Sequence, residues 1–152
     1  VAYILQPADV GYVTGTQHGL IAAIEDQSSG IIWAIAAYQS TAVPSGTLAT
    51  IGSGSANTDN IIAQNGAGIT YAAGKARSYA GGGYNDWYLP SKDELLILDN
   101  NRVAIGGFAP SYYWSSTEGG ANIAWSKSFP NSSWSSQLKN TQWTRVRAVR
   151  SF

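Results

Sequence analysis

Side chains able to carry catalysis are scarce in this sequence. His18 is the single histidine among 152 residues, and there is no cysteine. A lone histidine is more often structural than catalytic, and neither a Ser–His nor a Cys–His pair has a supporting context. Asp93 and Glu94 are adjacent carboxylates, but they fall in the first turn of an expected helix, where the helix dipole accounts for acidic residues. We therefore predict no catalytic residues and a protein that is not an enzyme.

Metal and cofactor sites also lack a recognisable pattern. The absence of cysteine excludes thiolate zinc sites. Oxygen-bearing side chains gather at residues 57–60 and at Asn85–Asp86, but neither stretch alternates ligands as a calcium loop does. Gly81–Gly83 is not followed by the Lys–Ser or Lys–Thr of a phosphate-binding loop. We expect no metal, no cofactor and binding without calcium.

The basic residues indicate anion binding instead. Residues 119–152 contain five Lys and Arg and no acid, whereas residues 1–74 contain four acids and no base. This asymmetry fits either an anion-binding face or two halves that pair with each other in the fold. No linear basic run is present, so a basic patch must be assembled in three dimensions. The candidate ligand-binding residues are Lys75, Arg77, Lys127, Lys139 and Arg145.

Two tryptophans are candidates for stacking on a sugar ring. Trp134 and Trp143 lie in a polar C-terminal stretch, where an indole exposed to solvent would be available to a ligand. The other aromatic candidates have the spacing of residues that pack a core or a sheet. These structural residues are Trp87, Trp114 and Trp125.

Ion pairs are expected to fix the last strand. Alternation along 144–152 places Arg145 and Arg147 on one face and Val146 on the other. Arg150 falls on the Val146 face, so we assign it a structural, paired role. Glu118 is the acid that we expect to join Arg147 and Arg150 in such internal pairs.

The elements that position these residues are predicted as strands, then two helices, then a β-meander. Ser91-x-x-Glu94 matches a capping box and predicts a helix that ends near Asn100 or Asn101. An earlier helix is expected from Asn57 or Thr58 to Ala76, although two glycines weaken it. The predicted strands cover 1–5, 20–24, 31–37, 112–118, 122–129, 133–138 and 144–151, with a hairpin turn at 26–30.

This order of elements indicates an α+β fold, and the length indicates one domain over 1–152. Charged residues make up only 12% of the chain, which is typical of the neutral, hydroxyl-rich surfaces of extracellular bacterial modules. Zero net charge disfavours nucleic-acid binding. No apolar run approaches the roughly 20 residues of a membrane-spanning helix, so we expect no membrane insertion.

Several motifs resemble a known family. The stretch from Gly83 to Ser91, GYNDWYLPS, is followed by Tyr113–Glu118, YWSSTE, and by the closing Val146–Arg150, VRAVR. Their order and spacing, over nearly the whole chain, resemble the bacterial surface-domain family represented by the C-terminal domain of the Legionella collagen-like adhesin, the Lcl C-terminal domain.

The resemblance implies a C-type-lectin-like fold with two helices packed on short antiparallel sheets. It also implies a homotrimer at the end of a collagen-like stalk, because a collagen helix needs three chains. The implied ligands are sulfated glycosaminoglycans such as heparin, bound by the basic residues above. We expect an extracellular domain on the bacterial surface, with its signal and stalk outside this sequence.

Two other functions remain open from the sequence. The first is a module for protein or neutral glycan that binds through residues such as Tyr112, Tyr113 and Trp134, in a manner insensitive to salt. The second is a structural cap that aligns a stalk trimer and binds nothing. Salt-sensitive binding would favour the sulfated ligand over both.

Overall fold

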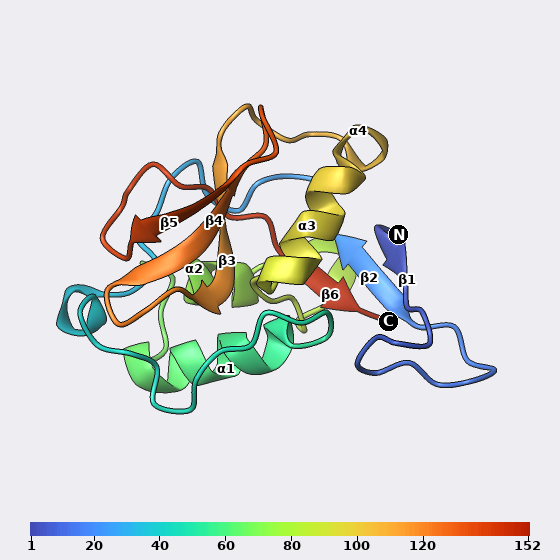
Figure 1. The fold of residues 1–152 in the computed structure, drawn as a ribbon, viewed down its shortest axis with the longest axis horizontal. Helices are drawn as coiled ribbons and strands as arrows, with labels where there is room; N and C mark the ends of the chain where they lie inside the picture. The colour runs from blue at the N-terminus through green and yellow to red at the C-terminus, as the bar shows by residue number, and fades with distance from the viewer.

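A computed structural model describes residues 1–152 as a mixed α and β protein with two small antiparallel sheets (Figure 1). The α-helices are α1 (Gly54–Asn65), α2 (Ala72–Arg77), α3 (Lys92–Asn100) and α4 (Arg102–Ile105), with 3-10 turns at Ala36–Tyr38 and Gly81–Gly83. The strands are β1 (Tyr3–Ile4), β2 (Gly19–Ala22), β3 (Tyr112–Glu118), β4 (Ile123–Ser128), β5 (Trp134–Leu138) and β6 (Val149–Ser151).

The first sheet joins the two ends of the chain. Its order is β1-β2-β6, with Leu20 opposite Ser151 and Ala22 opposite Val149. Beyond the strand, the backbones of Gly19 and Phe152 exchange two hydrogen bonds of 3.1 Å. Figure 1 shows the N- and C-termini on the same side of the molecule. The fold is therefore closed by residues at opposite ends of the sequence.

The second sheet is a three-stranded meander, β3-β4-β5. The sequence predicted a fourth strand of this meander over 144–151, and this is wrong. Residues 144–148 make only isolated bridges, such as Val146 with Ser28, before β6 joins the first sheet. Val146 and Ala148 are both fully buried in an extended segment that is covered on both sides. Their spacing therefore indicates burial but does not identify the strand with which this segment pairs.

The predicted first helix is two helices. Gly66 ends α1 with a φ of 82°, a conformation that glycine adopts without strain, and α2 begins six residues later at Ala72. The α3 prediction is confirmed in its details. The Ser91 hydroxyl accepts from the Glu94 backbone N–H, and the Glu94 carboxylate accepts from the Ser91 N–H at 2.8 Å.

The strand predicted over 31–37 and the hairpin turn at 26–30 are wrong. Gln27 N–H donates to the Val146 carbonyl, so this segment pairs with the C-terminal part of the chain and does not fold back on itself. Trp33 is fully buried and its indole N–H donates to the Ser115 carbonyl at 2.8 Å. In return, the Trp114 indole donates to the Ile31 carbonyl at 2.8 Å. The apolar run marks a buried loop that is attached to β3 by two indoles.

No helix has both the length and the apolar character required to cross a bilayer.

Candidate functional site

Ion pairs occupy most of the positive charge. Seven of the nine Lys and Arg side chains lie within 4.0 Å of a carboxylate. All five bases of the acid-free stretch 119–152 are among them, and their partners lie in earlier parts of the chain. The pairs are Lys127–Asp99, Lys139–Glu118, Arg145–Asp26, Arg147–Asp26 and Arg150–Asp86. The asymmetry of charge along the sequence is therefore largely cancelled in the fold.

Lys127 and Lys139 lie inside the protein. Their residues are 1% and 0% exposed. The Lys127 ammonium is 3.1 Å from the Asp99 carboxylate and donates to the Ser132 carbonyl at 2.7 Å. The Lys139 ammonium pairs with Glu118 and donates to the Thr41 carbonyl at 2.9 Å. Both ammonium groups have their partners within the core, so neither is available to a ligand at the surface. The prediction that Lys127 and Lys139 belong to a binding patch is therefore wrong.

Arg77 and Arg145 are partly exposed and paired. Each side chain is 28% exposed. Arg77 extends from α2 to Asp59 on α1, and Arg145 lies 3.1 Å from Asp26. These two arginines lie in different ion pairs, so the sequence-predicted bases do not form one cluster.

Two lysines have no ion pair. Lys75 is half-buried on α2, and Lys92 is half-buried at the start of α3. The Lys92 ammonium lies 3.8 Å from the centroid of the Trp125 ring and 5.0 Å from that of Trp134. Lys92 was not singled out from the sequence, and it is held by these two indoles on the β4-β5 sheet.

The tryptophans differ in their exposure. Trp87 and Trp114 are buried at 4% and 0%, and Trp125 is half-buried. Trp134 is also half-buried, with the ammonium groups of Lys92 and Lys127 at 5.0 and 4.8 Å from its centroid. Trp143, at 66%, is the exposed one of the two stacking candidates.

The structural ion pairs have other partners than the sequence suggested. Glu118 pairs with Lys139, and its carboxylate also accepts from the Val43 N–H. Arg147 is fully buried and reaches Asp26 at 2.7 Å. Arg150 meets Asp86 through two 2.8 Å hydrogen bonds. The expectation that Glu118 joins the two arginines is corrected: each arginine is neutralised by an acid that lies before β3.

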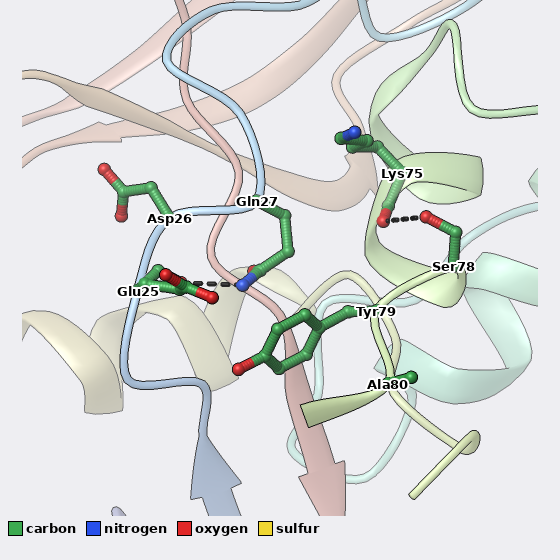
Figure 2. A pocket seen from close by; sticks show the side chains of 7 residues that line it. All are labelled: Glu25, Asp26, Gln27, Lys75, Ser78, Tyr79 and Ala80. Atoms are coloured by element: carbon green, nitrogen blue, oxygen red, sulfur yellow. Dashed lines mark hydrogen bonds between the residues drawn. The ribbon is translucent and has the colours of Figure 1, made fainter. Parts of the chain in front are cut away.

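A polar cavity of about 330 Å³ lies between the loop after β2 and α2. Figure 2 shows Glu25, Asp26 and Gln27 from the loop on one side, and Lys75 and Ser78 on the other, with the Tyr79 ring beside them. Glu25 is exposed and makes no ion pair with Lys75. The cavity therefore presents two unpaired charges of opposite sign.

An apolar cavity of about 280 Å³ adjoins it and shares Tyr79 as a lining residue. Its other walls include Ile24, which is 81% exposed, Tyr84, which is 50% exposed, and the edge of Trp87. The Tyr79 ring packs edge-on against Trp87, with centroids 4.9 Å apart. We call the two cavities together the Tyr79 groove.

Glycine at position 81 makes room for this arrangement. A Cβ atom on Gly81 would lie 2.2 Å from the Tyr79 hydroxyl oxygen, so any other residue would displace the ring. Gly82, which lines the apolar cavity, has a φ of 70°, where glycine is not strained. The glycine run ahead of the Asp86–Trp87 motif thus shapes the wall of the groove.

Tyr84 is held in place by Arg150. The guanidinium carbon lies 3.7 Å from the ring centroid, and the guanidinium is itself fixed by both Asp86 oxygens. The hydrogen bonds from Arg150 lower the pKa of Asp86, so this carboxylate remains charged. The result is a partly exposed aromatic ring on a fixed support, a suitable surface for the apolar face of a sugar.

The single histidine lies outside the Tyr79 groove. His18 lies at the chain ends, where its Nδ1 is 3.1 Å from the Phe152 carbonyl. No three His, Cys, Asp or Glu side chains converge as a metal site would require. Among the residues that line the groove, the sequence predicted a binding role only for Lys75, whereas Trp87 and Arg150 were predicted to be structural.

A family model described as the Lcl C-terminal domain matches residues 22–150. The chain belongs to the Lcl C-terminal domain family. The matched region of this Lcl-type domain contains both cavities of the Tyr79 groove, except for Ile21 at one wall. The family places the chain among the surface-associated adhesin-type domains. No curated protein matches the chain.

Proposed function

We propose that this chain is a non-enzymatic binding head of a bacterial surface adhesin, and that it recognises a glycan in the Tyr79 groove. The observation that carries the proposal is the adjacency of a polar cavity with unpaired hydrogen-bonding groups and an apolar cavity with a fixed tyrosine. Glycans present hydroxyls at their edges and C–H groups on their faces. Clefts with a few convergent polar groups on apolar walls suit such ligands.

We propose a C-type-lectin-like architecture for this head, at the extracellular surface of the cell. Supporting features are the pairing of both chain ends in the β1-β2-β6 sheet and the separate β3-β4-β5 meander. A homotrimer on a collagen-like stalk belongs to the same proposal. Three weak sites on one polymer would raise the apparent affinity by about 10²–10⁴ where the spacing permits.

The neutralised cations favour recognition by hydrogen bonds and stacking over recognition by charge. A polyanion needs several free cations, and only Lys75 and Lys92 have no carboxylate partner. Glu25 lines the same cavity as Lys75 and repels a sulfate that approaches it. We therefore place a glycan with few charges first.

A sulfated polysaccharide is the second candidate, and one feature favours it. Lys75 and Asp26 line the same cavity, and Asp26 is the partner of the partly exposed Arg145. The Arg145 side chain is 28% exposed, so it can donate to a sulfate while it stays paired with Asp26. Lys75 and Arg145 are then the two sequence-predicted bases available to one anionic ligand.

The test compares immobilised heparin, chemically desulfated heparin and neutral glycans at low and high salt. Binding to neutral glycans that persists at high salt, and that falls in Tyr84→Ala but not in Tyr12→Ala, supports the first candidate. Tyr12 lines neither cavity, so it controls for the loss of a tyrosine. Binding that requires sulfate and weakens with salt and in Lys75→Ala supports the second. A stable trimer that binds none of the ligands would contradict both and leave a structural cap.

A further inference from the structure

The two halves of the Tyr79 groove have opposite chemistry. The polar half is lined by Glu25, Gln27, Lys75 and Ser78, whereas six of the nine residues around the apolar half are hydrophobic. Because the halves share Tyr79, a ligand that fills both must carry a polar group and an apolar group side by side. Cavities of about 300 Å³ are at the small end for binding sites, so the ligand is of the size of one or two sugar residues.

The polar half offers both acceptors and donors. The exposed Glu25 carboxylate is free to accept from hydroxyls or from an amide N–H, and the Lys75 ammonium is free to donate. The Tyr79 hydroxyl has no side-chain hydrogen bond within the protein and lies against Gly81, so it is available where the two halves meet. Gln27 is not, because its side-chain oxygen accepts from the Ala148 N–H and its nitrogen donates to the Glu25 carbonyl.

The apolar half has few polar groups, and the hydroxyls of Tyr79 and Tyr84 are its free side-chain donors. Its arginine, Arg150, is committed to Asp86, and the Trp87 indole donates to the Gly81 carbonyl at 3.1 Å. A hydroxyl or a sulfate placed against Ile21, Ala22 and Ile24 would lose hydrogen bonds to water that these aliphatic walls do not replace, which is unfavourable. A methyl group would instead gain contact with Ile24 and Tyr84.

We propose that the groove selects an N-acetylated amino sugar. The ring hydroxyls lie in the polar half, and the acetamido group passes Tyr79, with its N–H directed to Glu25 and its methyl in the apolar half. This inference rests on the proposed function and names the ligand class of that site. A plain hexose fills only the polar half, and a free amino sugar lacks the methyl group that would contact the apolar walls.

The test is titration of the purified chain with N-acetylglucosamine and N-acetylgalactosamine oligomers, followed by calorimetry and saturation-transfer NMR. The corresponding glucosamine, glucose and galactose compounds serve as comparisons. We expect the N-acetylated sugars to bind about tenfold more tightly than the parent hexoses, since they add a buried methyl and a hydrogen bond to a carboxylate. The acetyl methyl protons should receive the strongest saturation from the protein.

Two substitutions locate the effect. Ile24→Asn removes an apolar wall and should abolish the preference for the acetyl group while leaving the weak binding of hexoses. Glu25→Gln should weaken the N-acetylated sugars more than the hexoses. Both residues are exposed, so the fold should persist. Val103→Asn, at a position on α4 that is 92% exposed, is the matched control and should change nothing.

The outcomes separate the inference from the proposed function. Equal affinity for acetylated and parent sugars, or an acetyl preference that survives Ile24→Asn, would overturn the inference and leave glycan binding intact. Failure of every glycan to bind, sulfated ones included, would overturn the proposed function itself.

Discussion

At the scale of single residues, the lysines divide into internal and surface groups. Lys139 is fully buried against Glu118, whose side chain is 10% exposed. Removing one partner of a buried pair leaves an uncompensated charge, so Lys139→Ala should lower the free energy of unfolding by about 3 kcal/mol or more. Urea denaturation followed by tryptophan fluorescence measures this change.

The control is Lys75→Ala, which removes an unpaired and half-buried lysine. Its free energy of unfolding should stay within about 0.5 kcal/mol of the parent. Joint replacement of Lys139 by Met and Glu118 by Gln should recover part of the loss, since no buried charge is left unpaired and the amide oxygen can still accept from the Val43 N–H. A Lys139→Ala protein as stable as the parent would contradict the internal role.

Arg150 should set both the charge of Asp86 and the position of Tyr84. Hydrogen bonds from Arg150 lower the pKa of Asp86 below its usual 3.8. In Arg150→Met this pKa should rise, as carboxyl-carbon NMR titration would show. A carboxyl whose pKa is lower in the folded than in the unfolded protein stabilises the fold at pH values above its unfolded-state pKa. This stabilisation is lost as the pH falls through its folded-state pKa. The difference in stability between parent and variant should therefore shrink in acid; a constant difference would indicate that packing on Tyr84 dominates.

At the scale of elements, the start of α3 is the best-defined local structure. The Ser91 hydroxyl caps the helix at the Glu94 N–H and also donates to the Thr50 carbonyl at 2.8 Å. Ser91→Ala should destabilise the protein by about 1–2 kcal/mol, the usual cost of a lost N-cap. Ser29→Ala, at an exposed serine that forms no side-chain hydrogen bond, should change the midpoint of thermal unfolding little. Equal midpoints for the two variants would show that the cap contributes nothing.

The elements that the sequence predicted correctly are those with local signals. A capping box lies within four residues, so α3 was found with its true start. The run of three aromatic residues followed by three hydroxyl-bearing residues in β3, bounded by turn-prone segments, likewise gave the right bounds, Tyr112–Glu118. The segment at 31–37 was misjudged because an apolar run records burial, and burial of Trp33 requires no strand. The partner of β6 was missed because β2 lies at the far end of the chain.

The candidate site was harder to predict for a related reason. Its walls come from three separate stretches, represented by Glu25, Tyr79 and Tyr84, and none carries a motif for binding. The glycines at 81–83 were the one sequence feature that pointed to this site, since a run of glycines indicates that another group packs closely against the backbone. The basic residues, in contrast, were predicted to bind a ligand although two of them are internal. Lys127 and Lys139 could be recognised as buried only from the structure, which places Asp99 and Glu118 beside them.

At the scale of the whole molecule, the last strand holds together parts of the chain that are distant in sequence. Val149 is fully buried, pairs with Ala22 of β2, and exchanges two backbone hydrogen bonds with Tyr88 at 2.8 and 3.0 Å. Tyr88 in turn precedes the start of α3, and Arg150 supports Tyr84 in the groove. The strand β6 thus connects the terminal sheet, the helix and the groove.

Removal of residues 149–152 should therefore abolish cooperative unfolding, although the segment is only four residues long. The truncated chain loses the outer strand of the first sheet and exposes the edge of β2. It also leaves the Tyr88 backbone groups without partners, each of which costs about 1–3 kcal/mol when buried. These losses are a large share of the about 5–15 kcal/mol that stabilises a typical domain. Differential scanning calorimetry should show no sharp transition, whereas removal of Val1, which is 79% exposed, should leave the transition unchanged. A sharp transition in the truncated chain would mean that the β3-β4-β5 meander and its helices fold without closure of the chain ends, and the groove would then have to be formed without Arg150.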